Sequence, residues 1–253
     1  DAFYQETNET AHRLDPTRPT GGVRAIKNSH LLEDVYTYND FVHNGKNQGC
    51  EPRNAVTENA EKAYLISEFN GHMFPTKSWD SEAHRREHAI RHARVLNAAA
   101  AGENISGCFG WCMFDYNTHK EFGSGDRICY HGVLDMFRNP KLAAAVYASQ
   151  QDAKPVLEIS STMNIGEQPG GYIGGVVVLT NGDSVRLYKN NELIRQYFPA
   201  PSYGHLMHPP VVITDFVGES LEKKEGFDEK TADLIKQWLK WKESNPQDRK
   251  SVV

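Results

Sequence analysis

A long helical pattern lies between two short apolar runs, and it constrains the fold more than any other feature of this sequence. Residues 81–101 carry the helical pattern, with Ser81 as a candidate N-cap and Gly102 just past its end. The apolar runs lie at 63–66 and 106–114. Alternation of short apolar runs with helices favours parallel α/β units, so we expect a parallel sheet here.

The same alternation extends over residues 1–152. Helical patterns are expected at 1–13 and 140–150, and further strands at 22–26 and 32–38. After residue 153 the pattern changes to strand candidates separated by Gly- and Asn-rich turns, at 156–160, 172–180, 184–189 and 192–198. Asn190-Asn191 is a tight-hairpin signal, and 228–243 is an amphipathic helix capped by Asp228. The expected domains are therefore an α/β domain at 1–152 and a β-module with a terminal helix at 153–253.

Composition excludes several classes of protein. Hydrophobic residues make up 39% and charged residues 24%, as in globular proteins, and the net charge of −5 argues against nucleic acid or an acidic membrane as partner. No apolar run is long enough to span a bilayer, so no membrane association is expected. The four cysteines are too few for a disulfide scaffold, and no signal peptide is visible. A cytoplasmic location is favoured.

Polar or ionisable side chains follow the expected strands at their carboxyl ends, which is where (β/α) barrels build their active sites. They are Asn39 and Asp40, then Glu68 with Asn70 and His72, then Trp111 with Asp115 and Asn117. From the residues alone, Glu68 is either a carboxylate held on a strand for chemistry or the first residue of a solvated loop.

Three motifs follow one another along the chain: Leu-Asp-Pro-Thr-Arg-Pro at 14–19, Ile-Ser-Glu-Phe-Asn-Gly at 66–71, and the stretches at 110–116, 132–135 and 138–141. In this order they resemble glycoside hydrolase family 2. The stretch at 66–71 resembles the end of that family's seventh barrel strand, which carries the nucleophile. Leu-Asp-Pro-Thr-Arg-Pro at 14–19 resembles the segment before the fifth strand. The stretches at 110–116, 132–135 and 138–141 resemble the eighth strand and the helix after it.

The resemblance implies the C-terminal half of a (β/α)₈ TIM barrel, strands five to eight, followed by an immunoglobulin-like β-sandwich module. It implies a retaining glycosidase of β-galactosidase type that cleaves terminal β-D-galactosides or related oligosaccharides by double displacement. A β-glucuronidase or β-mannosidase of the same family is the alternative. A non-catalytic carbohydrate-binding or scaffold fragment is the alternative from another class.

The resemblance also implies roles for individual residues. Glu68 is the expected nucleophile, and Trp111 is the expected stacking platform for the sugar, unless it is an ordinary core tryptophan. His72 and Asn39 are candidates for contacts to sugar hydroxyls, and Asp115 either binds sugar or braces Trp111. The family usually has a tyrosine that hydrogen-bonds its nucleophile. The aligned position in this chain is Phe41, with Tyr38 and Tyr36 nearby, so this role stays open among them.

The family's acid/base glutamate lies in an Asn-Glu pair at the end of the fourth strand. The pair Asn8-Glu9 lies inside a helical pattern instead, so we interpret it as unrelated and expect the acid/base upstream of Asp1. The isolated chain is then predicted to be inactive, with the remainder of the enzyme as its partner and a homo-oligomer as a further expectation. No cofactor is assigned; the resemblance leaves Mg²⁺ or Na⁺ open.

One further pattern is His84, His88 and His92, which recur every four residues on the long helix. They would suit a metal site, but the HExxH pattern is absent and the same helix is rich in arginine. We favour the interpretation that they lie on a solvated outer face.

Overall fold

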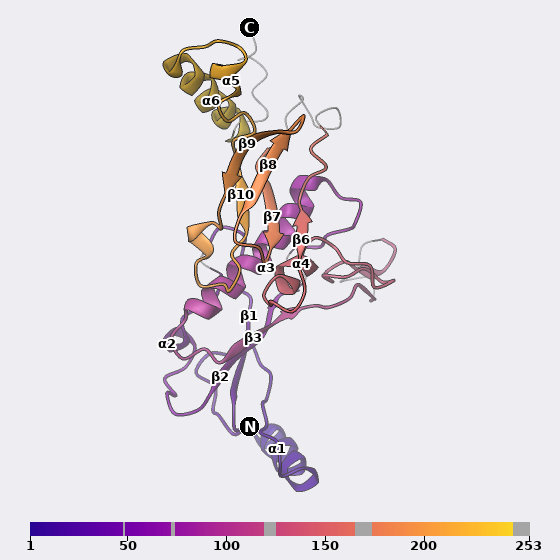
Figure 1. Ribbon diagram of the computed structural model, residues 1–253. Coiled ribbons are helices and arrows are strands. Elements are labelled where there is room, and N and C mark those ends of the chain that lie inside the picture. The colour runs from indigo at the N-terminus through magenta and orange to yellow at the C-terminus, as the bar shows by residue number, and fades with distance from the viewer. Residues whose placement is uncertain (48, 72–73, 119–124, 165–173, 245–253) are drawn as a thin grey trace. The chain divides into compact units, whose positions relative to one another are not determined.

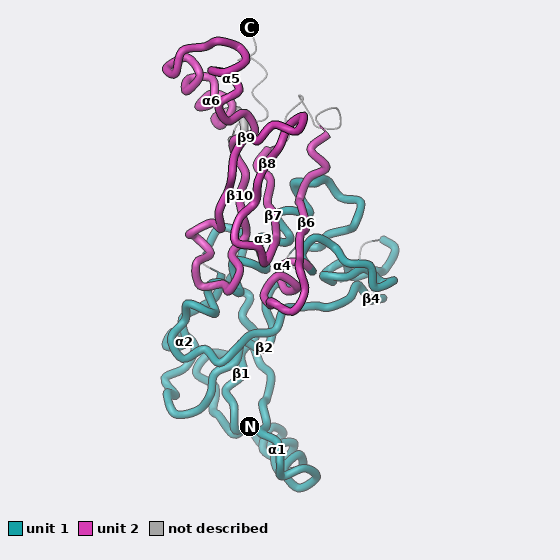
Figure 2. The backbone as a smooth tube through the Cα atoms, viewed as in Figure 1, with its two compact units in different colours: residues 1–144 teal, residues 145–253 magenta. Residues whose placement is uncertain are grey.

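The computed structural model describes residues 1–47, 49–71, 74–118, 125–164 and 174–244 (Figure 1). The chain divides into two compact units, Asp1–Ala144 and Ala145–Val253, which Figure 2 colours teal and magenta. The described residues mix helix and sheet, and no sheet among them closes into a barrel. None of the helices in these ranges is long and apolar enough to cross a membrane.

The first unit opens with helix α1, Ala2–Leu14, which confirms the helix expected at 1–13. The helix ends at Asp15, directly before Pro16. The Asp15 carboxylate accepts hydrogen bonds from the Thr17 backbone N–H, at 2.9 Å, and from Arg18 Nε, at 2.6 Å. The Asp-Pro-Thr-Arg segment is therefore a tight turn held by its own side chains.

A parallel sheet forms the centre of this unit and confirms the expected α/β arrangement. Strands β1 (Tyr36–Asp40), β2 (Tyr64–Asn70) and β3 (Gly107–Trp111) lie in the order β1-β2-β3, and both pairings are parallel. The rings of Tyr36 and Tyr64 stack at 6.0 Å between centroids, and both side chains are buried. Strand β2 is central, so the carboxyl end of β2 has a neighbouring strand on each side.

Helix α3, Glu82–Ala101, connects β2 to β3 and packs against both strands. Ser81 caps it by accepting a hydrogen bond from the His84 N–H at 3.3 Å, and Gly102 follows its last residue, as expected. The expectation of a solvated histidine face is wrong for His88 and His92, which are only 4% and 1% exposed. The interspersed alanines let this face of α3 lie close to the sheet, where the His92 ring meets the Phe69 ring edge-on.

Other expectations for the first unit are corrected. No strand forms at 22–26; a single bridge joins Gly21 to Val35 instead, because Arg24 turns inward to a buried ion pair with Glu33. The helix expected at 140–150 is only the short α4, Ala144–Ala148, which begins at the last residue of this unit. The remaining elements are α2 (Arg53–Val56) and an antiparallel pair of short strands, β4 (Tyr116–Asn117) and β5 (Ile128–Cys129).

The second unit contains two antiparallel β-structures. One is a sheet of β6 (Leu157–Ile159), β7 (Val176–Thr180) and β10 (Val211–Ile213), with β7 in the centre. The other is the hairpin of β8 (Val185–Lys189) and β9 (Glu192–Tyr197). Asn190 and Asn191 form its turn with φ of 51° and 66°, which confirms the hairpin signal. Residues 172 and 173 of the strand expected at 172–180 lie outside the described residues.

The hairpin packs against the sheet through a small apolar core. Val176 and Val178 of β7 and Val211 and Ile213 of β10 are fully buried, and Val185, Leu187 and Tyr197 of the hairpin pack on them. The chain then forms the 3₁₀ turn η4 (Pro201–Tyr203), helix α5 (Ser220–Lys223) and helix α6 (Glu229–Ser244). Asp228 accepts the Thr231 N–H at 2.9 Å, which confirms the expected cap.

Candidate functional site

The carboxyl ends of β1 and β2 place Asn39 and Glu68 side by side. The two residues are register partners, and their side chains meet directly: Asn39 Nδ2 donates to Glu68 Oε2 at 3.0 Å. The Asn39 Oδ1 atom accepts a hydrogen bond from Ser67 Oγ at 2.9 Å. One amide therefore orients both the carboxylate and the residue that precedes it.

An irregularity in the sheet sets the direction of Glu68. The register of β2 shifts against β1 between Tyr38 and Asn39, and against β3 between Ile66 and Phe69. A register shift of this kind turns a side chain away from the simple alternation of a strand, and shifts of this kind often occur beside active sites. Glu68 lies within the irregular stretch and is half-buried.

Gly71 lies close to Glu68 and to Trp111, the last residue of β3. The chain takes left-handed backbone conformations at Asn70, with φ of 67°, and at Gly71, with φ of 60°. A β-carbon at Gly71 would lie 3.4 Å from Glu68 Oε1, 3.9 Å from Phe41 Cε1 and 3.9 Å from Trp111 Cβ. The expected site residues Glu68, Asn39 and Trp111 are thus gathered at one edge of the sheet, with the Phe41 ring beside them.

Trp111 is the last residue of β3, and its indole is 41% exposed. The indole Nε1 donates to Tyr116 Oη at 3.1 Å, and the two rings meet edge-on. The peptide bond between Trp111 and Cys112 is cis. An indole that is tied down at its nitrogen and still partly open to solvent can offer one face to a ligand.

Asp115 lies in a different environment from Trp111, because its carboxylate is buried. The Asp115 Oδ1 atom accepts from Lys141 Nζ at 2.6 Å and from the Gly132 N–H at 2.9 Å. Burial raises the pKa of Asp115 and lowers the pKa of Lys141, while their mutual attraction opposes both shifts. Lys141 also donates to the Thr76 carbonyl at 2.7 Å. Of the two expected roles of Asp115, the brace fits this burial better than a sugar contact.

His72, the remaining expected contact, lies outside the described residues. Glu9 lies in α1 with an exposed side chain, where its carboxylate accepts from Gln5 Nε2 at 2.9 Å. Sequence reasoning missed Ser67, Tyr116 and Lys141. Each lies inside one of the motifs that carry the family resemblance, and that was the available signal.

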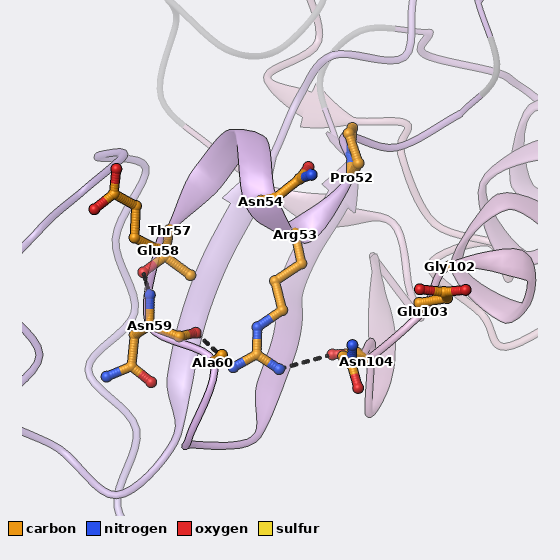
Figure 3. Close-up of a pocket in the computed structure, with 10 residues that line it drawn as sticks. All are labelled: Pro52, Arg53, Asn54, Thr57, Glu58, Asn59, Ala60, Gly102, Glu103 and Asn104. Carbon is orange, nitrogen blue, oxygen red and sulfur yellow. Dashed lines mark hydrogen bonds between the residues drawn. The ribbon is translucent and has the colours of Figure 1, made fainter.

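A separate cavity of about 440 Å³ lies where the chain enters β2 and β3, at the opposite ends of those strands from Glu68. Figure 3 shows Arg53 reaching between its walls. The guanidinium donates to the carbonyls of Asn59, at 2.7 Å, and Asn104, at 3.2 Å. Arg53 therefore clamps the loops that precede the strands, so we interpret this cavity as structural.

A metal site was left open by the family resemblance. Within the described ranges, no three His, Cys, Asp or Glu side chains are grouped so that they could hold a metal ion. Mg²⁺ or Na⁺ finds no such ligand set among these described residues.

Comparison with known proteins gives close relatives. A curated beta-galactosidase of Thermoanaerobacterium thermosulfurigenes is 49% identical over 218 residues, which cover 84% of this chain and 30% of the relative. A beta-galactosidase of Rhizobium meliloti is 43% identical over 225 residues, covering 83% of this chain and 30% of the relative. This chain therefore spans about 30% of the length of these relatives. No family model matches it.

Solved structures share the fold at lower identity. The structure of an FMN-binding beta-glucuronidase from Facaelibacterium prausnitzii L2-6 aligns with a TM-score of 0.63 and 20% identity, covering 83% of this chain and 34% of that one. Bacteroides uniformis beta-glucuronidase 3 aligns with a TM-score of 0.58 and 20% identity, covering 82% of this chain and 29% of that one.

Proposed function

We propose that this chain, a homologue of bacterial beta-galactosidases over about 30% of their length, is part of a family 2 retaining glycoside hydrolase that cleaves terminal β-D-galactosides. The observation that carries the proposal is the cluster of Glu68, Asn39 and Trp111 at the carboxyl ends of parallel strands. In this proposal residues 1–152 are the C-terminal half of a (β/α)₈ barrel, and 153–253 are a β-sandwich module.

Glu68 is the nucleophile of the proposed double displacement. Its Oε2 atom accepts a hydrogen bond from Asn39, which orients the carboxylate for attack on the anomeric carbon. Attack forms a covalent glycosyl–enzyme and expels the leaving-group oxygen, and water then hydrolyses the ester. A second carboxylate, about 5–5.5 Å from the first, protonates the leaving group and activates the water. We assign it to a part of the enzyme outside these 253 residues.

The sugar is held by the remaining site residues. The indole of Trp111 suits the apolar C–H face of a pyranose. His72 is assigned to hydroxyl contacts, as is the second amide hydrogen of Asn39. Asp115 acts indirectly, through the buried pairing with Lys141 that supports the segment after Trp111.

Galactose is preferred over glucuronic acid as the recognised sugar. The relatives at 49% and 43% identity are named beta-galactosidase, while the glucuronidases share only the fold at 20% identity. A glucuronidase would need a cation for the sugar carboxylate. The cation described near this site is Lys141. It is already paired with Asp115 and is only 7% exposed, so it is not available to a sugar carboxylate.

Covalent trapping in the complete enzyme tests the proposal. The substrate is a 2-deoxy-2-fluoro-β-galactoside with a dinitrophenolate leaving group, which departs without being protonated. The sugar should therefore become attached to the nucleophile, and the resulting glycosyl–enzyme should hydrolyse slowly. Mass spectrometry should find one deoxyfluorogalactosyl group on the peptide containing Glu68, and none in Glu68→Gln. A label on another carboxylate would refute the nucleophile assignment. Faster labelling by the matching fluoroglucuronide would refute the choice of sugar.

A further inference from the structure

The indole of Trp111 is the first member of a series of linked polar side chains. An indole N–H can only donate, so the bond of 3.1 Å to Tyr116 makes the Tyr116 oxygen the acceptor. The phenolic proton of Tyr116 is then available for a different partner. The rings of Trp111 and Tyr116 lie at 82° to each other, and the Tyr116 hydroxyl meets the indole at its nitrogen edge.

The residue opposite Tyr116 lies on the facing strand. Tyr116 of β4 and Cys129 of β5 are register partners, so their side chains are neighbours on one face of this strand pair. Burial is the main reason that the pKa of Tyr116 rises to about 12, so the phenol keeps its proton at neutral pH. Tyr116 can therefore donate toward Cys129 while it accepts from Trp111.

The series ends at a buried histidine. Cys129 Sγ lies 2.8 Å from His131 Nδ1, and the two residues are only 2% and 3% exposed. Residues two apart in an extended segment point to the same side, which places the imidazole behind the thiol. With Nδ1 as the unprotonated ring nitrogen, the thiol donates to His131 and its sulfur can accept from Tyr116.

The backbone beside Trp111 is attached to the same segment. The Cys112 N–H donates to the His131 carbonyl at 3.3 Å, and the Val133 N–H donates to the Cys112 carbonyl at 3.0 Å. The main chain after Trp111 is thus held by His131 and Val133, and its ring nitrogen is held by Tyr116, which pairs with Cys129 of the same segment. Buried polar groups that are all satisfied in this way define a single arrangement.

We propose that Tyr116, Cys129 and His131 are positioning residues that form a directed hydrogen-bond relay, Trp111 N–H to Tyr116 O–H to Cys129 S–H to His131 Nδ1, which fixes the indole plane as the sugar platform. The inference rests on the proposed function, because it takes Trp111 as that platform. The relay acts on binding of the sugar and not on the bond-making step, so it should affect KM more than kcat.

Variants that interrupt the relay test it in the complete enzyme. Tyr116→Phe keeps the ring and removes the hydroxyl, and should raise KM for a β-galactoside by roughly 10-fold while kcat changes little. Cys129→Ala interrupts the relay one step further and should act in the same direction. Cys129→Ser keeps a donor and an acceptor at that position and should restore most of the loss. Tyr188→Phe, at a tyrosine 52% exposed in β8, is the matched control and should change nothing.

A spectroscopic readout separates the relay from the catalytic proposal. The contribution of Trp111 to near-ultraviolet circular dichroism is the difference between the parent and Trp111→Phe. That band should weaken in Tyr116→Phe and Cys129→Ala and return in Cys129→Ser. An unchanged band and KM in Tyr116→Phe, or a Cys129→Ser variant no better than Cys129→Ala, would overturn the relay. Full turnover by Glu68→Gln would instead defeat the proposed function and leave the spectroscopic result standing.

Discussion

The side-chain amide of Asn39 lies between two consecutive residues of the neighbouring strand, donating to Glu68 Oε2 at 3.0 Å and accepting from Ser67 Oγ at 2.9 Å. The contact depends on the register shift that pairs Asn39 with Glu68. Without that shift, the alternation of the strand would turn Glu68 to the other face of the sheet. Asn39 is therefore both a support for the carboxylate and a marker of the irregular register.

Replacing Asn39 should reduce turnover without unfolding the protein. Asn39→Ala removes a hydrogen bond to a charged group, and we expect kcat/KM for a β-galactoside to fall roughly 10- to 100-fold. Asn39→Asp places a second carboxylate beside Glu68, so the acidic limb of the pH–rate profile should move to higher pH. Steady-state kinetics across pH in the complete enzyme measures both effects. Parent-like profiles in both variants would show that Asn39 does not act on Glu68.

The ion pair of Asp115 and Lys141 should be essential to stability, since their side chains are only 2% and 3% exposed. Asp115→Leu or Lys141→Met leaves one buried charge without its partner, and each should lower the free energy of unfolding by about 3–5 kcal/mol. The double variant should recover much of that loss. Urea unfolding at neutral pH is the measurement. Arg195→Met is the control, because Arg195 is 58% exposed in its pair with Asp215 and should cost less than about 1 kcal/mol.

Buried histidines should make the protein sensitive to acid. Burial lowers the pKa of His92 to about 3, and it lowers the pKa of His88 as well. Below the ordinary histidine pKa of about 6.5 the unfolded chain binds protons that the folded chain does not, so stability falls as pH falls toward 3. For His92 alone, the loss between pH 7 and pH 5 is about 2 kcal/mol.

The test compares unfolding free energies at pH 7 and pH 5. His92→Gln should show a smaller difference than the parent. His84→Gln is the control for replacing a histidine of the same helix, because the His84 side chain is 36% exposed. An equal pH dependence of the unfolding free energy in the parent and in His92→Gln would show that His92 is not the source of the acid sensitivity.

The hairpin turn of the second unit should tolerate glycine and reject a β-branched residue. Asn191 has φ of 66°, where a residue with a branched side chain is strained by about 1–2 kcal/mol. Asn191→Val should therefore lower the thermal midpoint, and Asn191→Gly should leave it nearly unchanged. Glu192→Val, one residue further along in β9, is the control for added apolar bulk and should have little effect. Equal midpoints for the two Asn191 variants would exclude strain at this position.

Structural features that depend only on residues close together in the chain could be predicted from the sequence. Helix α1 ends at a proline segment, α3 has a serine cap, and the Asn190-Asn191 turn needs left-handed backbone that asparagine tolerates. The parallel sheet followed from the helix between its strands. The motif around Glu68 was also readable, because the strand, its carboxylate and the following glycine lie within a few residues.

The sequence by itself therefore determined most helices and strands, the position of Glu68 at a strand end and the resemblance that gives it a role. Only the tertiary structure decided that Asn39 binds Glu68, that Lys141 neutralises Asp115, and that His88 and His92 face the sheet. The physical reason is that sheet register and helix rotation are set by hydrogen bonds and packing between residues far apart in the chain, where a shift of one position reverses which side chains are buried.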